Sequence, residues 1–199
     1  ADSALTLRIL RFARIRGGTT WLPAALDLYA GGTGEEVGET ELQLALPWAM
    51  FSADAGNGVS MAQMFRDEHP SKLPPPLREM LDAQLNAWLG LWDVRSVERG
   101  VGMQVTDLLS GEERFVHEIS GSAAIDERAV ILGRVVDVGG VAIFGGIHPN
   151  PLEPMDADIA VREIRRMCRV RTRPIAVERL RQPHIELARL YIQTGDRAQ

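Results

Sequence analysis

The sequence has little or none of several features on which whole classes of protein depend. Its 199 residues contain one cysteine, Cys168, which excludes an internal disulfide and a multi-cysteine zinc site within this chain. The longest apolar run, residues 45–51, is far shorter than the roughly 20 residues that a membrane-spanning helix needs. No basic segment followed by an apolar segment opens the chain, so no secretory signal is visible. We therefore expect a cytoplasmic protein with no membrane partner.

Lysine is also nearly missing, because 21 of the 22 basic residues are arginine. The charge is unevenly distributed. From residue 160 onward there are ten arginines and four acidic residues, whereas the first 159 residues carry 12 basic and 23 acidic groups. One interpretation is that the arginine content follows the base composition of the genome. The other is an arginine face for phosphates or carboxylates, which the planar guanidinium binds through two parallel hydrogen bonds.

The composition is otherwise that of a globular protein with a core, at 45% apolar and 25% charged residues. Residues 1–90 predict a helical region. Within it, Ser60 and Gln63 fit a capping box at the start of a short helix. Leu77 and Leu81 belong to an apolar series at helical spacing that follows a proline-rich break.

The hydrophobic period changes to two over residues 91–146, which predicts a run of short strands. Gly139 and Gly140 suit a two-residue hairpin turn with positive φ angles. The predicted strands are residues 91–97, 103–108, 113–118, 130–138 and 141–145. Five short antiparallel strands favour a small barrel of the SH3 type or one related to the oligonucleotide-binding fold. The predicted fold class is therefore α+β, and residues 147–199 complete it as a proline-rich linker and arginine-rich C-terminal helices.

Three stretches resemble a known family: LALPWAMF, AWLGLWDVRSVERGVGMQVTDLLSGEERFVHE and RVVDVGGVAIFGGIHPNPL. They fall within residues 42–154, and their most specific part is DLLSGE at residues 107–112. In this pattern the chain is similar to an uncharacterised bacterial family whose members often carry a C-terminal SEC-C zinc motif. The resemblance implies no particular activity. It also implies no metal site here, because the cysteine-rich zinc segment is absent from this chain.

The DLLSGE motif also has a structural explanation. Asp107 is placed to accept hydrogen bonds within a turn and Gly111 to relieve backbone strain, so we interpret Asp107 and Glu112 as turn residues rather than catalytic carboxylates. The histidines share no metal-ligand spacing. The enzymatic alternative is a hydrolase-type site at the helix–barrel junction, around His117, Asp107 and His148.

The C-terminal region contains the most distinctive surface of the chain. Asp156 is placed to cap a helix that continues to about residue 173, with an apolar stripe on one side. The rest of its circumference is rich in arginine, and we predict a binding site made of Arg162, Arg165, Arg166, Arg169 and Arg173. Alternatively, these arginines form weak surface pairs with acidic residues at positions 35–41. A last helix is predicted over residues 183–195.

These features lead to three hypotheses. The first is a non-enzymatic interaction or regulatory module that uses the barrel and helices to bind a protein partner or a further domain of the same protein. The second is nucleic-acid binding through the arginine-rich helix of residues 157–173, although the barrel strands offer few aromatic rings for base stacking. The third is the hydrolase-type enzyme. We expect no cofactor and no bound metal.

Overall fold

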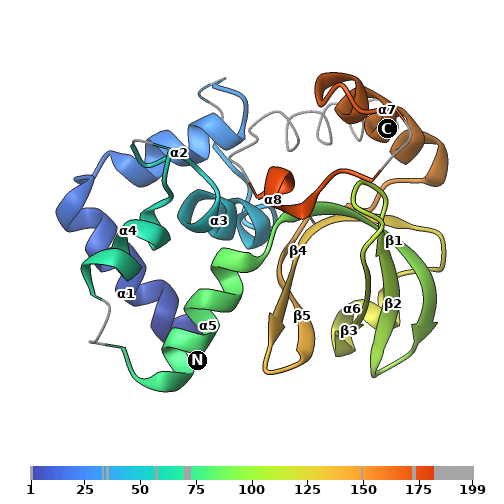
Figure 1. Cartoon of the computed structure of the whole chain (residues 1–199), viewed down its shortest axis with the longest axis horizontal. Coiled ribbons are helices and arrows are strands. Elements are labelled where there is room, and N and C mark those ends of the chain that lie inside the picture. Colours follow the sequence, from blue (N-terminus) through green and yellow to red (C-terminus); the bar gives the residue numbers. More distant parts are fainter. Residues whose placement is uncertain are drawn as a thin grey trace.

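The fold is described from a computed structural model, in which the described residues are 2–32, 34, 36–56, 58–69, 73–148, 150–171 and 174–181. Figure 1 shows a group of helices on one side and a β-barrel on the other, with a further helix packed against the barrel. The predicted α+β class is confirmed.

The helical group contains Asp2–Arg16 (α1), Trp21–Tyr29 (α2), Leu42–Phe51 (α3), Met61–Glu68 (α4) and Pro75–Asn86 (α5). The predicted cap of α4 is confirmed, because the Ser60 hydroxyl accepts a hydrogen bond from the Gln63 backbone N–H at 3.2 Å. Helix α5 begins at a proline, whose fixed φ suits the first helical turn. Helix α3 has six buried residues out of ten, which is the pattern of a helix enclosed by its neighbours.

The barrel strands are Leu89–Glu98 (β1), Gly102–Asp107 (β2), Glu113–His117 (β3), Val130–Val138 (β4) and Val141–Ile147 (β5). They form a closed barrel in the order β1-β2-β3-β5-β4, in which β4 also pairs with β1. The prediction of a wholly antiparallel barrel is wrong for one pair, because β3 and β5 run parallel. The chain leaves β3 through a short helix, Ile119–Ala124 (α6), and enters β4 beside β1, so β5 returns along β3 in the same direction. This five-stranded Greek-key barrel is of the oligonucleotide-binding type.

Two clusters of apolar side chains form the core, and α3 contributes to both. The first joins the barrel interior with α2 and α3, and includes Trp48 and Trp92. The second joins α1, α4 and α5 with the end of α3, where Met50 and Phe51 lie. Thus the core continues across the change from α5, which ends at Asn86, to β1, which begins at Leu89, and α2 and α3 are anchored on the barrel.

A buried arginine on β4 lies between the barrel and the helical group. Arg134 is 1% exposed, and its Nη2 donates to the carbonyl of Gln84 at 2.7 Å. Its Nη1 donates to the Ser52 hydroxyl, and its guanidinium lies 5.5 Å from the centre of the Phe51 ring. Burial lowers the pKa of Arg134 to about 10, and no carboxylate of the described residues forms an ion pair with it. These contacts connect α3 and α5 to β4.

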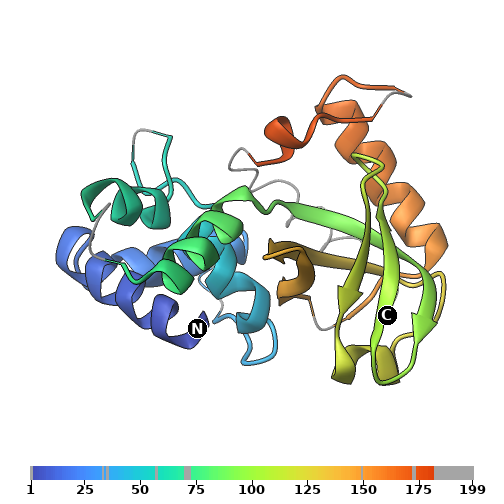
Figure 2. The same ribbon diagram turned by 60° about the horizontal axis from the view of Figure 1, so that its bottom comes forward.

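Two more helices follow the barrel, Pro154–Met167 (α7) and Val177–Leu180 (α8). Helix α7 starts after Glu153 and not at the predicted cap Asp156, because Pro154 is accommodated in its first turn. Figures 1 and 2 place the helical group beside β4 and β5, and α7 along β1 away from that group. The predicted helix at residues 183–195 lies outside the described residues. No helix within the described ranges is long and apolar enough to cross a membrane.

Candidate anion-binding site

The arginines of α7 line a groove at its C-terminal end. The groove has a volume of about 470 Å³. Its described lining residues are Arg162, Arg165, Arg166, Arg169, Val170 and Arg171. We call it the arginine groove. It brings together four of the five residues predicted from the sequence and adds Arg171; the fifth, Arg173, lies outside the described residues.

Helical spacing explains how these side chains come together. Residues three and four apart share one side of an α-helix, so Arg162, Arg165, Arg166 and Arg169 form a continuous series. The opposite side of α7 is small and apolar, and its Ala157, Ala160 and Ile164 are buried. The apolar side holds α7 on the barrel and leaves the arginines on the outside.

Three of the five arginines of the groove have partners among the described residues. Arg162 Nε donates to the Asp158 carbonyl at 3.2 Å. Arg166 pairs with Glu163 on its own helix at 2.8 Å, and Arg165 Nη2 donates to the Leu108 carbonyl at 3.1 Å. The guanidinium groups of Arg169 and Arg171 have no hydrogen bond or ion pair with any described residue.

The alternative, that these arginines pair with acidic residues at positions 35–41, finds no support among the described ion pairs. None of those pairs joins the groove to Glu36, Glu39 or Glu41. Glu35 lies outside the described residues. Among the described ion pairs, the only carboxylate that reaches an arginine of the groove is therefore Glu163, which pairs with Arg166.

Arg169 has a backbone conformation that favours glycine, with φ at +52°. It follows the C-cap of α7 in a Schellman motif, in which Val170 N–H donates to Arg165 C=O at 2.9 Å and Arg169 N–H donates to Arg166 C=O at 3.0 Å. Glycine is the usual residue there, since a side chain in the left-handed region costs on the order of 1–2 kcal/mol. Strained positions of this kind are concentrated at functional sites.

The β2–β3 turn contacts the groove through the Leu108 carbonyl, which accepts from Arg165, and Asp107 organises that turn. Its buried carboxylate accepts hydrogen bonds from Trp88 Nε1 at 3.0 Å, from the backbone N–H groups of Leu91, Leu109 and Ser110 at 3.2–3.3 Å, and from Ser110 Oγ at 2.6 Å. Burial raises the pKa of Asp107 above its usual range, and the hydrogen bonds act in the opposite direction. The interpretation of Asp107 as a turn residue is confirmed.

Two residues of the hydrolase alternative, His117 and Asp107, lie far apart. His117 pairs with Gly102 at one end of the β2–β3 ladder and Asp107 lies at the other end, about 17 Å away at the strand rise. His117 is exposed and contacts the Phe115 ring, whereas His148 is buried and its Nδ1 lies 3.1 Å from the Asn150 carbonyl. In the described part of the chain, no group of three His, Cys, Asp or Glu side chains is placed to hold a metal ion.

Comparison with known protein families gives a match that includes the barrel. Residues 35–151 match a family of unknown function, DUF7986. The chain belongs to this family. The resemblance to an uncharacterised family is thereby confirmed. Comparisons with curated proteins and with solved structures found no match.

The DUF7986 region contains the whole barrel together with α3, α4 and α5. It includes Asp107 and Arg134 and ends just before α7 begins at Pro154. The arginine groove therefore lies outside the matched DUF7986 region, on α7 and the residues that follow it.

Sequence reasoning found most of the groove from the helical spacing of its arginines, but it did not include Arg171. That residue follows the end of α7, and its place in the groove depends on the turn at Arg169. Sequence reasoning also missed Arg134, because a charged residue in a predicted strand is ordinarily assigned to the exposed face. No signal in the sequence marks that strand face as covered.

Proposed function

We propose that this chain is a non-enzymatic binding module whose arginine groove binds the phosphates of nucleic acid. The observation that carries the proposal is five guanidinium groups lining one groove that has no carboxylate among its described lining residues. Guanidinium groups bind phosphate oxygens in a bidentate manner, and Arg169 and Arg171 are available to do so.

The charge distribution in the rest of the chain favours binding of a polyanion at the groove over binding elsewhere. Most of the acidic residues precede α7, so a polyanion is attracted to the groove and repelled by the rest of the surface. The barrel is of a type that other proteins use for oligonucleotides, which agrees with the proposal, although a fold alone does not determine function.

Binding of this kind has a characteristic dependence on salt. Each neutralised phosphate of a single strand contributes about −0.7 to the slope of log K against log salt. Five contacts therefore predict a slope near about −3.5 and a loss of roughly 100-fold in affinity between about 50 and 200 mM salt.

The test is fluorescence anisotropy with a labelled single-stranded oligothymidylate at several salt concentrations. We expect the triple variant Arg162→Ala/Arg166→Ala/Arg169→Ala to lose most of the affinity and more than half of the salt slope. The matched control removes three exposed arginines from α1, in Arg8→Ala/Arg11→Ala/Arg14→Ala, and should bind as the wild type does. No binding at low salt, or an equal loss in the control, would contradict the proposal.

A protein partner is the second candidate, and one observation favours it. Met155 and Ile159 lie one turn apart on α7 and are 80% and 38% exposed. A partner recovered by the wild type and retained by Met155→Ser/Ile159→Ser would exclude this apolar pair as the contact.

We also propose that the module is cytoplasmic. From the DLLSGE turn we propose further that its family is the bacterial one whose members often carry a SEC-C zinc motif.

A further inference from the structure

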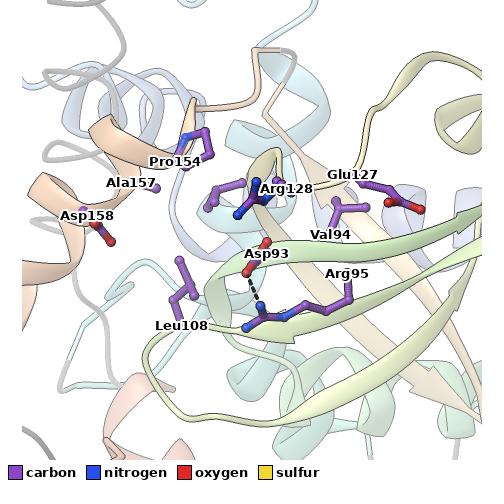
Figure 3. A pocket seen from close by; sticks show the side chains of 10 residues that line it. Asp93, Val94, Arg95, Leu108, Glu127, Arg128, Pro154, Ala157 and Asp158 are labelled. Carbon is purple, nitrogen blue, oxygen red and sulfur yellow. Dashed lines mark ion pairs between the residues drawn. The ribbon is translucent and has the colours of Figure 1, made fainter.

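A second cavity, of about 450 Å³, opens between β1, the loop before β4 and the N-terminal half of α7 (Figure 3). We call it the α7–β1 cavity. Its apolar walls come from Val94, Leu108, Val130, Pro154 and Ala157. Its charged lining residues are Asp93, Arg95, Glu127, Arg128 and Asp158.

The charges of this cavity differ from those of the arginine groove. Two arginines and three carboxylates line it, so it lacks the uniform positive charge that attracts phosphate. Its mixture of donors and acceptors above apolar walls instead suits a polar ligand without net charge, held by a few directed hydrogen bonds. A nucleobase has this chemistry.

Arg128 projects into the cavity from a strained backbone. Its φ is +72°, and with Arg169 it is one of the two non-glycine residues of the described chain that have positive φ. Its backbone N–H donates to the Val94 carbonyl at 2.7 Å, which holds the loop against β1. Its guanidinium has no hydrogen bond or ion pair with the described residues. Each of the two cavities along α7 thus receives one arginine held in a conformation that favours glycine.

Asp93 supplies an oriented acceptor on the wall formed by β1. Its Oδ2 pairs with Arg95 Nη1 at 3.0 Å, and Arg95 Nε donates in turn to Thr106 Oγ1 at 3.3 Å. The Asp93 side chain is 16% exposed, so the carboxylate is fixed by its neighbours and still reaches the cavity. Figure 3 shows the Asp93 carboxylate and the Arg128 guanidinium within the same space.

We propose that the α7–β1 cavity binds one unpaired guanine base of a nucleic-acid strand whose phosphates lie in the arginine groove. This inference rests on the proposed function and adds base selectivity to it. Guanine presents two adjacent acceptors, O6 and N7, which an arginine binds in a bidentate manner. On its Watson–Crick edge it presents two adjacent donors, N1–H and the N2 amino group, which suit a carboxylate. Arg128 and Asp93 match these two edges, and no other common base offers both pairs.

The two cavities are close enough to serve one strand. Asp158 lines the α7–β1 cavity and Arg162 lines the arginine groove, and these residues are one turn apart, about 6 Å along α7. The Arg162 Nε donates to the Asp158 carbonyl at 3.2 Å. A base and the phosphate attached to it therefore need to span only adjacent turns of the helix.

The test compares labelled oligothymidylates that carry a single central guanine, adenine or cytosine with the unsubstituted strand, by anisotropy with the full chain. We expect one guanine to raise the affinity roughly fivefold or more, and adenine or cytosine to raise it less. Arg128→Gln and Asp93→Asn should each abolish the guanine preference and leave oligothymidylate binding unchanged. Glu153→Gln, close to the cavity but outside its lining, is the control and should keep the preference.

The outcomes separate the two proposals. If oligothymidylate does not bind at low salt, the proposed function fails and the guanine site fails with it. If oligothymidylate binds but guanine adds nothing, or if the preference survives both Arg128→Gln and Asp93→Asn, only the guanine site is wrong. Because Arg128 is exposed, Arg128→Gln should remain folded and keeps the test decisive if Asp93→Asn unfolds.

Discussion

Arginines on the two sides of the barrel have opposite environments. On the side facing α3 and α5, Arg134 is buried, stacks on Phe51 and uses its donors to join the helices to β4. On the side facing α7, Arg169 and Arg171 are exposed and their guanidinium groups make no ion pair with the described residues. Arginines therefore have different roles in different parts of this chain, so arginine content alone does not indicate a function. One side uses the guanidinium for assembly of the fold, whereas on the other side no described residue forms an ion pair with the guanidinium groups of Arg169 and Arg171.

Removing the Asp107 carboxylate, which organises the turn next to α7, should have the largest effect on stability. We expect Asp107→Ala to lower the free energy of unfolding by about 3–5 kcal/mol, because several buried donors lose their acceptor at once. Since the turn also contacts Arg165 and Ile175, hydrogen exchange in α7 should accelerate as well. Urea unfolding measures the first effect and amide exchange the second.

Asp137 provides the matched control, because its carboxylate accepts from the Gly140 N–H at 3.0 Å in an exposed hairpin. Asp137→Ala should cost less than about 1 kcal/mol. Equal costs for the two substitutions would mean that burial does not distinguish these turns.

The contribution of Asp107 to the free energy of unfolding changes with pH in a definite direction. Because burial raises the pKa of Asp107 in the folded state, its ionisation opposes folding, and this opposition develops as the pH rises above the unfolded pKa.

On the helical side, Arg134→Met should increase stability by about 1–2 kcal/mol. The lowered pKa, about 10, means that the folded state disfavours the charged form of Arg134 at neutral pH. Methionine removes that cost and keeps the apolar contact with Phe51, although Gln84 C=O loses a donor. Arg166→Met on the exposed side is the control and should change stability by less than about 0.5 kcal/mol.

The pH dependence of the same pair gives an independent check. Well below pH 10 both folded and unfolded chains carry the charge of Arg134, so the cost of burying that charge is constant. Above that pH the folded chain releases the proton first, and the stability of the wild type rises relative to Arg134→Met. If the difference in the free energy of unfolding between the wild type and Arg134→Met stayed constant from pH 9 to about 11, burial would not disfavour the charged form of Arg134.

Local sequence pattern predicted the strands well but not their assembly. The expected strand at residues 130–138 coincides with β4, because alternation and the glycine pair at 139–140 define it locally. Helix α6 was not predicted, since ISGSAA is short and has no helical periodicity. The parallel β3–β5 pair depends on that helix, so it was missed for the same reason.

Sites built from one helix were predictable, whereas sites built from several segments were not. The arginine groove follows from the spacing of residues along α7. In contrast, the α7–β1 cavity brings together Asp93, Arg128 and Pro154, which are distant in sequence. Their proximity is a consequence of barrel closure and of where α7 packs, neither of which is encoded in a local pattern.

The smallest predicted effect concerns the two strained arginines, and it separates charge from backbone conformation. Arg169→Gly should relieve the left-handed strain and increase stability by about 0.5–1 kcal/mol, after allowance for the greater freedom of glycine in the unfolded chain. It should nevertheless weaken oligothymidylate binding, because it removes a guanidinium from the groove. Arg169→Ala, which removes the charge and keeps the strain, should show the same loss of affinity without the gain in stability. Arg128→Gly should show the same gain in stability with oligothymidylate affinity intact, since Arg128 lines the other cavity. If both glycine variants were less stable than the wild type, Arg128 and Arg169 would stabilise the fold. Their left-handed backbone conformation would then not lower its stability.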